Sequence, residues 1–443
     1  MTMRRLILLL LAMALAVPIM ATETVAGAFA TGRYRNLFQE LLGKTDAEIN
    51  AKLDTAWQQI ARGDPANQRL IHLIGDDMAY IPDVGNRDVR SEGMSYGMMI
   101  AVQLNHQKEF NALWKYAKTF MYHDSGPMRG YFTWHTAYNG TQVRDDGSVI
   151  RGNGPAPDGE EWFVMALFFA AHRWGSAQDN SAGGADSGIF NYGAEAQALL
   201  RTMIHKDEET ERGDQTSMFD PVAKQIKFVP AGPRSRFTDA SYHLPAFYAL
   251  WARWATDPKD REFLAEVTRT SREFFKRVAH PKTGLMPNYS AFDGGNAGIF
   301  GPDEFREDAW RTLSNPALDY SWWAADPWQI EQSNRVLTFF AAQPLDDWPT
   351  HIKLDGTPTH TGEKSGGLFA MAACAGLAAD PTIAKPFVQH LWDMPVPDDH
   401  GRNADGVRKT GALRSQRYYD GLLTVLAFLE VSGHFRIYAP ATP

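Results

Sequence analysis

The sequence predicts an all-α fold, a toroid in which paired helices surround a central axis. Three observations support this prediction. Apolar residues recur at helical spacing in thirteen segments of the chain. Short turns join the two helices of a pair, whereas longer loops rich in Gly, Pro and Asp separate successive pairs. No fixed sequence period relates the pairs, which favours a closed toroid over a regular solenoid.

The predicted helices cover most of the chain and leave little room for strands. We expect them at residues 35–42, 46–62, 92–105, 107–122, 160–174, 192–204, 241–255, 258–278, 310–324, 327–342, 365–377, 381–394 and 418–431. The main strand candidates are QIKFVP (225–230) and GYFTW (130–134). In such a toroid the inner helices and their connecting loops line one concave face.

The N-terminal segment has the pattern of a secretory signal peptide. Two arginines precede an apolar run from Leu6 to Val17, and small residues follow near Ala21. The run is too short to span a membrane. We therefore expect residues 1–21 to be a signal peptide and the protein to be exported, to the periplasm or the medium. Residues 22–443 are expected to form a single domain, because no linker-like stretch interrupts them.

Charge and cysteine content exclude several classes of partner and cofactor. Without residues 1–21 the chain has 42 basic and 52 acidic side chains, a net charge of −10. This balance argues against nucleic acid or an anionic membrane as partner. No second apolar segment of spanning length follows, so a soluble protein is expected, with a monomer as the default. The single cysteine, Cys374, precludes an internal disulfide and is expected to be a buried small hydrophobe. The 13 histidines lack zinc-ligand spacing, which argues against a zinc enzyme, and His243 is interpreted as a hydrogen-bonded residue at a helix start.

Three carboxylates stand at loop-to-helix junctions beside aromatic residues. They are Glu92 in SEGMSYGMM, Asp158 in NGPAPDGEEWF and Asp308 in FREDAWR. Each motif also has an ordinary structural interpretation. Ser91 is expected to cap the first helix, Asp158 and Glu161 to form a capping box, and Asp308 to cap a helix while pairing with Arg311. A fourth acid, Asp239 in FTDASYH, is interpreted as a helix cap only.

Acids that line an aromatic groove suit the hydrolysis of sugars. The chain has 13 Trp, 15 Tyr and 25 Phe, and sugar rings stack on such side chains. Glycoside hydrolysis needs one carboxylic acid to protonate the leaving oxygen and a second carboxylate to activate water or attack. The helix dipole favours ionised Glu92, but burial and a neighbouring carboxylate such as Asp158 would raise its pKa. Glu92 is therefore predicted to be the proton donor.

Several blocks of the sequence resemble glycoside hydrolase family 8. The likeness runs in order from about residue 34 to 440, and it favours the reducing-end xylose-releasing exo-oligoxylanase branch. The resemblance implies an (α/α)6 barrel that hydrolyses β-1,4 bonds of xylan or xylo-oligosaccharides with inversion, without metal or cofactor. It is carried by SEGMSYGMM, NGPAPDGEEWF, FTDASYHLPAFY, EDAWR, LDYSWWAADPW and RYYDGLLTVLAFLEVSGHFRIYAP.

The resemblance also implies a role for individual residues. Glu92 matches the general acid, Asp308 the general base and Asp158 the acid that binds and distorts the sugar at the cleavage point. Arg311 matches the arginine that steadies the base. The other residues implied in substrate binding are an aromatic platform, two tyrosines of a block that borders the attacking water, and the tyrosine of the SEGMSYG block: Trp134, Tyr418, Tyr419 and Tyr96. Inversion needs room for water, so the two catalytic carboxyls are expected about 6.5–9.5 Å apart.

One late loop departs from the exo-acting pattern. In exo-acting members a histidine shortly before a Gly-Leu step helps to close the cleft. In HTGEKSGGLFAM the aligned position holds Lys364, and the nearest histidine, His360, lies four residues earlier. Release of xylose from the reducing end is the preferred prediction. An endo-β-1,4-xylanase, an endoglucanase and, from a different class, an inactive secreted carbohydrate-binding protein remain as alternatives; the three acids disfavour the last.

Overall fold

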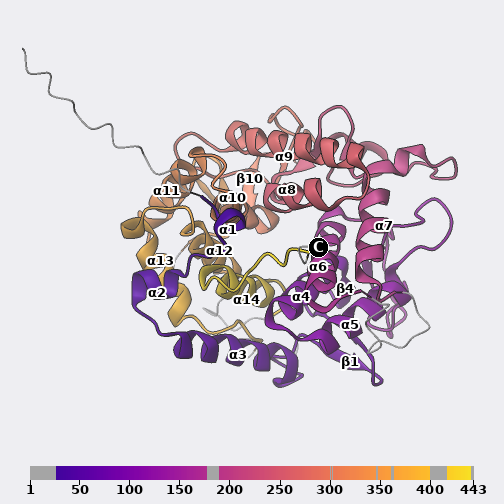
Figure 1. Cartoon of the computed structure of the whole chain (residues 1–443), viewed down its shortest axis with the longest axis horizontal. Coiled ribbons are helices and arrows are strands. Elements are labelled where there is room, and N and C mark those ends of the chain that lie inside the picture. Colours follow the sequence, from indigo (N-terminus) through magenta and orange to yellow (C-terminus); the bar gives the residue numbers. More distant parts are fainter. Residues whose placement is uncertain are drawn as a thin grey trace, which may run out of the picture.

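The computed structural model describes residues 26–176, 189–299, 301, 303–345, 348–360, 364–399 and 417–440. Within these residues twelve of the fourteen α-helices form two concentric rings, an (α/α)6 barrel, as predicted (Figure 1). The inner ring consists of α4 (Ser91–Leu104), α6 (Pro157–Trp174), α8 (Pro245–Trp254), α10 (Asn315–Trp323), α12 (Gly366–Ala375) and α14 (Tyr419–Val431). The outer ring consists of α3 (Asp46–Arg62), α5 (Gln107–Tyr116), α7 (Tyr192–His205), α9 (Pro258–Val278), α11 (Trp328–Ala341) and α13 (Pro381–Asp393). Two short helices, α1 (Ala28–Thr31) and α2 (Leu37–Leu42), pack on α10 and α13.

The distribution of apolar residues explains which helix belongs to which ring. Inner helices are apolar on all sides: every residue of α12 is buried, and so are 12 of the 14 residues of α4. The outer helix α9 instead buries one stripe that includes Leu264, Phe274 and Phe275, and its other faces are charged. Cys374 lies in α12 and is buried, as predicted.

Three predicted helices are interrupted in the structure. The segment 241–255 is a 3₁₀ turn, η5 (Ala240–Tyr242), followed by α8. The segment 310–324 is likewise a 3₁₀ helix, η6 (Glu307–Leu313), followed by α10. Pro245 and Pro316 stand in the first turns of α8 and α10, where a residue without an N–H starts a helix but cannot continue one. The segment 107–122 is α5 followed by a π-helical turn, η1 (Ala117–Met121).

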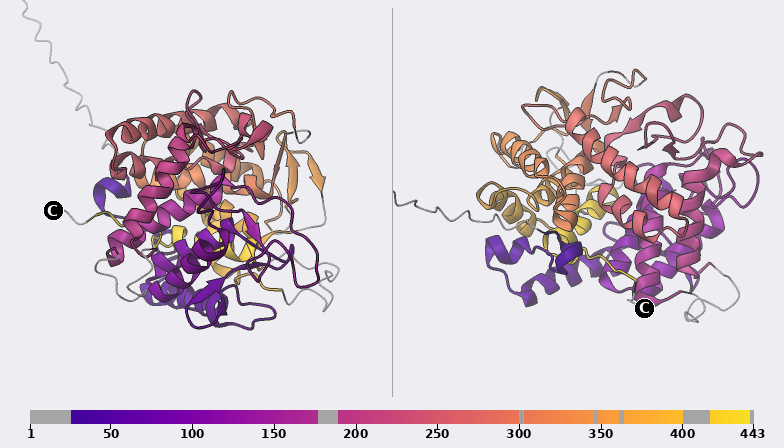
Figure 2. Two further views of the ribbon diagram at one scale, coloured as in Figure 1. Left: turned by 90° about the vertical axis from the view of Figure 1, so that its right-hand side faces the viewer. Right: turned by 45° about the horizontal axis from the view of Figure 1, so that its top comes forward.

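Short antiparallel strands and loops gather toward one end of the barrel, on the right of the left-hand view in Figure 2. The strand predicted at 225–230 is present as β7, but the one predicted at 130–134 was wrong: within it only Phe132 makes an isolated bridge, with Tyr122, and the strand β5 begins after it. The N-terminal ends of α4, α6, α10 and α14 meet, because side chains at the start of these helices, or just before it, contact one another. The strands are β1 (His72–Ile74), β2 (Met78–Tyr80), β3 (Pro82–Asp83), β4 (Asp88–Arg90), β5 (His135–Thr136), β6 (Phe219–Asp220), β7 (Gln225–Ile226), β8 (Thr238–Asp239), β9 (Tyr289–Ser290), β10 (Glu304–Arg306), β11 (His351–Lys353) and β12 (Pro358–His360), and further 3₁₀ turns are η3 (Lys206–Glu208) and η4 (Gly232–Arg236).

The predicted signal peptide, residues 1–21, lies outside the described residues. In the part of the chain that the structure describes, every helix is too short or too polar to cross a bilayer.

Candidate active site

Three acids from distant parts of the chain converge on one arginine. Arg311 Nη1 lies 3.1 Å from Glu92 Oε1 and 3.2 Å from Asp158 Oδ2, and its Nη2 lies 3.3 Å from Asp308 Oδ1. The Arg311 side chain is only 5% exposed, whereas that of Asp308 is 31% exposed. The three candidate acids and Arg311 therefore form one site, with Asp308 its most accessible carboxylate.

Glu92 is the second residue of α4, directly after strand β4. The prediction that Ser91 caps this helix was wrong: Arg90 occupies the cap position, and no side chain caps the helix. Instead, the Ser91 N–H donates to the carbonyl oxygen of Trp134 at 3.0 Å. This bond continues the pairing of β4 with β5 by one residue, so the first N–H of the helix has a backbone partner.

The other two acids also differ from their predicted capping roles. Asp158 follows Pro157 inside the first turn of α6, and its Oδ1 accepts from the N–H of Gly159 at 2.9 Å. The predicted capping box is absent, because Glu161 is buried and accepts a hydrogen bond from Tyr248. Asp308 lies inside η6, whose cap is not Asp308, but its predicted ion pair with Arg311 is present.

A second set of polar groups holds Arg311 in place. Its Nη2 donates to Ser241 Oγ at 2.9 Å, and Ser241 in turn donates to Asp239 from both its N–H and its hydroxyl, each at 2.7 Å. Asp239 caps η5, as predicted. Tyr96 is fully buried and contacts Arg311 Nη1 through its hydroxyl, a position from which it supports the arginine. Sequence analysis missed Ser241, although the block FTDASYH contains it.

Two cavities, each of about 350 Å³, meet at the acids. Glu92, Asp308 and Arg90 line both cavities. The first is further lined by Ser91, Trp134, Gly152, Gly154, Pro155, Ala156, Asp158, Phe228, Val229, Arg234 and Tyr242. The second is further lined by Asp83, Asn86, Glu307, Trp310, Tyr418, Tyr419 and Asp420. A chain that occupied both cavities would place one of its bonds beside the acids.

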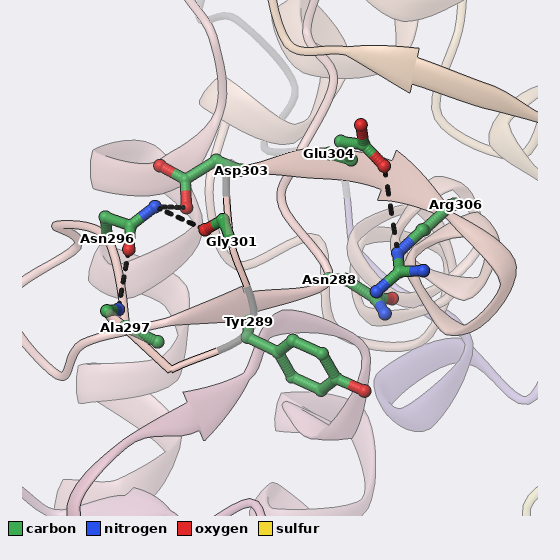
Figure 3. A pocket seen from close by; sticks show the side chains of 9 residues that line it. Asn288, Tyr289, Asn296, Ala297, Gly301, Asp303, Glu304 and Arg306 are labelled. Carbon is green, nitrogen blue, oxygen red and sulfur yellow. Dashed lines mark hydrogen bonds and ion pairs between the residues drawn. The ribbon is translucent and has the colours of Figure 1, made fainter. Parts of the chain in front are cut away.

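Polar side chains around a small pocket beside the site hold the segment that leads to Asp308 (Figure 3). Asn296 binds Asp303 and the carbonyl oxygen of Gly301, and Asn288 accepts from the N–H of Ala309 at 3.1 Å. Glu307, the residue before Asp308, has a φ of 44°, the left-handed conformation that non-glycine residues rarely adopt. These contacts fix the backbone on both sides of the acid.

Small residues near Glu92 admit protein side chains. The Tyr418 hydroxyl donates to Glu92 Oε2 at 3.1 Å, whereas that of Tyr419 donates to the carbonyl oxygen of Glu307 at 3.4 Å. A Cβ atom on Gly93 would lie 2.3 Å from the ring of Tyr418. Only a glycine therefore allows Tyr418 to reach the carboxylate of Glu92.

We expect Gly93→Ala to destabilise the protein by about 1–3 kcal/mol, the usual result of forcing a methyl group into a packed interior. Urea unfolding followed by circular dichroism measures this change. Gly154→Ala is the matched control, since a Cβ there meets nothing within 4 Å, and its free energy of unfolding should stay near that of the wild type. An equal response of the two variants would contradict the tight contact with Tyr418.

Burial sets the protonation of the two inner carboxyls. It raises the pKa of Glu92 to about 8; Arg311 opposes this shift, and Asp158 and Asp308 add to it. The pKa of Asp158 is raised to about 6, again mainly by burial and against the pull of Arg311. This is the direction expected for Glu92, because the effect of burial on its pKa outweighs the opposing charge of Arg311. Glu92 is thus protonated at neutral pH.

Known proteins share this architecture. The model for Glycosyl hydrolases family 8 matches residues 81–429. The reducing-end xylose-releasing exo-oligoxylanase Rex8A of Paenibacillus barcinonensis is 40% identical over 94% of this chain and 99% of that protein. A reducing end xylose-releasing exo-oligoxylanase of Bifidobacterium adolescentis is 32% identical over 89% of this chain and 94% of its own.

Solved structures agree with these sequence comparisons. Rex8A complexed with xylose aligns with a TM-score of 0.80 at 40% identity, over 93% of this chain and 100% of that chain. A GH8 xylobiose complex from Teredinibacter turnerae aligns with a TM-score of 0.81 at 40% identity, over 94% and 100% of the two chains. The family model, the similar sequences and the similar structures agree, and the chain belongs to glycosyl hydrolases family 8.

Proposed function

We propose that this protein hydrolyses β-1,4-xylosidic bonds of xylo-oligosaccharides with inversion and releases xylose from the reducing end. The observation that carries the proposal is the pairing of two unlike carboxyls at the boundary between the cavities. Glu92 is buried and protonated, whereas Asp308 is partly exposed and held by Arg311. The naming of the relatives at 32–40% identity supports xylo-oligosaccharides as the substrate class.

The reaction follows from this pairing. Glu92 donates its proton to the glycosidic oxygen while positive charge develops on the sugar ring. Asp308 takes a proton from a water molecule that attacks the anomeric carbon from the opposite face. Asp158, which faces the first cavity, binds the sugar at the cleavage point. Arg311 contacts Glu92, Asp158 and Asp308 and holds the three side chains in position.

The pKa of Glu92 predicts the alkaline limit of activity. We expect kcat/KM to fall as the pH rises through about 8, because ionised Glu92 has no proton to donate. Asp158→Asn removes a negative charge that raises the pKa of Glu92, so the alkaline limb should move to lower pH. Profiles of kcat/KM against pH for both proteins measure the shift, with Asp54→Asn in the outer helix α3 as control. An alkaline limb of the Asp158→Asn profile that stays at the same pH or shifts to higher pH would contradict the assignment of Glu92 as the proton donor.

The proposed end specificity depends on the second cavity. Glu307 lines this cavity, His351 Nε2 lies 3.9 Å from Glu307 Oε1, and the rings of His351 and His360 are 5.4 Å apart. His360 therefore belongs to a cluster at the rim of the second cavity. Lys364 directly precedes the cap of α12, and residues 361–363 lie outside the described chain. We propose that the second cavity accepts the reducing-end xylose.

A product time course tests this proposal. Xylohexaose labelled at its reducing end is incubated with the enzyme, and early products are separated by chromatography. Labelled xylose together with unlabelled xylopentaose is the expected pattern. Early labelled di- and trisaccharides would instead indicate an endo-xylanase, and turnover of cello-oligosaccharides without cleavage of xylohexaose would indicate an endoglucanase. Tight binding without any cleavage would indicate an inactive carbohydrate-binding protein.

We also propose that residues 1–21 direct export and that the remainder acts as a single-domain monomer. The basic, apolar and small-residue order of the segment supports export. N-terminal sequencing of the protein from the periplasm and the medium tests this, and size-exclusion chromatography with light scattering tests the monomer. An intact N-terminus in the cytoplasm would contradict export.

A further inference from the structure

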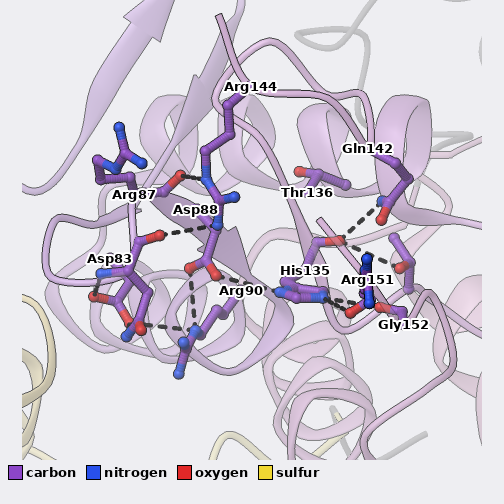
Figure 4. Close-up of polar contacts among 12 residues, drawn as sticks. Asp83, Arg87, Asp88, Arg90, His135, Thr136, Gln142, Arg144, Arg151 and Gly152 are labelled. Atoms are coloured by element: carbon purple, nitrogen blue, oxygen red, sulfur yellow. Dashed lines mark hydrogen bonds and ion pairs between the residues drawn. The ribbon is translucent and has the colours of Figure 1, made fainter. Parts of the chain in front are cut away.

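One charged side chain at the boundary between the cavities has no part in the reaction described above. Arg90, the last residue of β4, has its Nε 3.1 Å from Asp88 Oδ1 and 3.2 Å from Asp83 Oδ2 (Figure 4). The side chains of Asp88 and Asp83 are only 3% and 2% exposed, whereas that of Arg90 is 24% exposed. Two buried carboxylates thus hold one arginine at the surface of the cleft.

We propose that Arg90 binds substrate, donating hydrogen bonds from its terminal nitrogens to hydroxyl groups of the sugars beside the cleaved bond. This inference rests on the proposed function and assigns one further residue to its site. Arg90 lines both cavities, a property that it shares with Glu92 and Asp308. It precedes Glu92 by two residues in the sequence.

The orientation of the guanidinium supports the proposal. Among the described residues, the hydrogen bond and both ion pairs of Arg90 fall on Nε. Figure 4 shows its two terminal nitrogens pointing away from Asp83 and Asp88. The guanidinium carbon lies 5.2 Å from the centre of the Trp134 ring, which lines the first cavity. The N–H donors of the terminal nitrogens are therefore directed at the cleft, where a ligand can supply acceptors.

The surrounding network makes this arginine rigid. His135, which pairs with Arg90 across β4 and β5, has its Nδ1 3.2 Å from Asp88 Oδ2 and its Nε2 2.8 Å from the carbonyl oxygen of Gly152. The same ring thus connects the support of Arg90 to the loop that lines the first cavity. A preorganised guanidinium loses little conformational entropy on binding. Because two carboxylates already match its charge, neutral hydroxyl groups are the ligands that it suits.

Binding and kinetics of Arg90 variants test the proposal. Arg90→Gln removes the charge and the guanidinium, but it leaves two buried carboxylates without their partner. Arg90→Lys keeps the charge between Asp83 and Asp88 and removes the terminal N–H fork, so it is the variant expected to fold. The Kd for xylohexaose is measured by calorimetry in an Asp308→Asn background, and KM and kcat for xylotriose are measured with Asp308 intact.

We expect Arg90→Lys to raise Kd and KM by about 10- to 100-fold, the range for loss of charge-assisted hydrogen bonds, and to change kcat less. Arg87→Gln is the matched control, since Arg87 is 62% exposed and pairs with Asp146 outside both cavities. It should leave both constants unchanged.

Two results would overturn the role of Arg90 while leaving the proposed function intact. One is an unchanged Kd and KM for Arg90→Lys in an enzyme that cleaves xylotriose. The other is a lower kcat at an unchanged Kd, which would mean that Arg90 acts only through Glu92. A wild-type protein that neither binds nor cleaves xylo-oligosaccharides would overturn both the role of Arg90 and the proposed function.

Discussion

We expect Glu92→Gln to lower kcat/KM for xylohexaose by about 10²- to 10⁴-fold, the contribution typical of a positioned general acid. Glutamine keeps the shape of the side chain and its contacts with Arg311 and Tyr418, but it has no proton of suitable acidity to donate. Steady-state kinetics with xylohexaose measure the loss. Glu331→Gln, an exposed glutamate in the first turn of α11, is the matched control and should retain full activity.

A substrate whose leaving group needs no proton separates a general acid from a residue that only supports the fold. β-Xylobiosyl fluoride releases fluoride without protonation, so Glu92→Gln should hydrolyse it nearly as fast as the wild type does. If the variant loses activity on the fluoride and on xylohexaose to the same extent, Glu92 is not the proton donor.

Asp308→Asn should cause a loss of similar size, because an amide cannot take the proton of the attacking water. The effect should appear in kcat with xylohexaose, since Asp308 lines both cavities, contacts Arg311 and acts in the proposed function as the base. Asp54→Asn, in the outer helix α3, is the control and should leave kcat unchanged.

Chemical rescue identifies the base more directly than the loss of activity. Asp308→Ala leaves space for a small nucleophile that needs no deprotonation, so added azide should restore turnover of xylohexaose and yield xylose and an α-xylopentaosyl azide. The absence of rescue in a folded Asp308→Ala protein, or a β-xylopentaosyl azide, would contradict the role of Asp308 as the base for an inverting attack.

Helical periodicity predicted the helices of the two rings well, because the same burial that places a helix in a ring also determines the spacing of its apolar residues. The segment predicted at 92–105 is α4 at Ser91–Leu104, and its apolar residues surround the whole helix. The segments at 241–255 and 310–324 were predicted as single helices because their apolar spacing continues across the breaks. The prolines at 245 and 316, whose missing N–H starts a new helix, are the physical signal that marks the breaks.

Each acid could be predicted from its own motif, but the contacts that bring the acids together around Arg311 could not. Arg311 lies 219 positions from Glu92 in sequence, and no local pattern shows that the two side chains touch. Ser91 was predicted as a cap because its type favours that role, yet the helix already begins at Ser91, and Arg90 at the end of β4 takes the cap position. Arg90 and Ser241 were missed for a similar reason, because contacts with distant parts of the chain place them in the site. Arg90 pairs with His135 across two strands, and Ser241 accepts a hydrogen bond from Arg311.

The stereochemistry of hydrolysis tests the central claim, that Glu92 and Asp308 act as acid and base on opposite faces of the sugar with water between them. Proton NMR during the first minutes of xylotriose hydrolysis, at an enzyme concentration that outpaces mutarotation, reports the anomer at the newly formed reducing end of xylobiose. The account predicts that the α-anomer appears first and the β-anomer follows by mutarotation. Initial accumulation of the β-anomer would mean a retaining enzyme, with one carboxylate attacking the sugar directly, and would contradict the account.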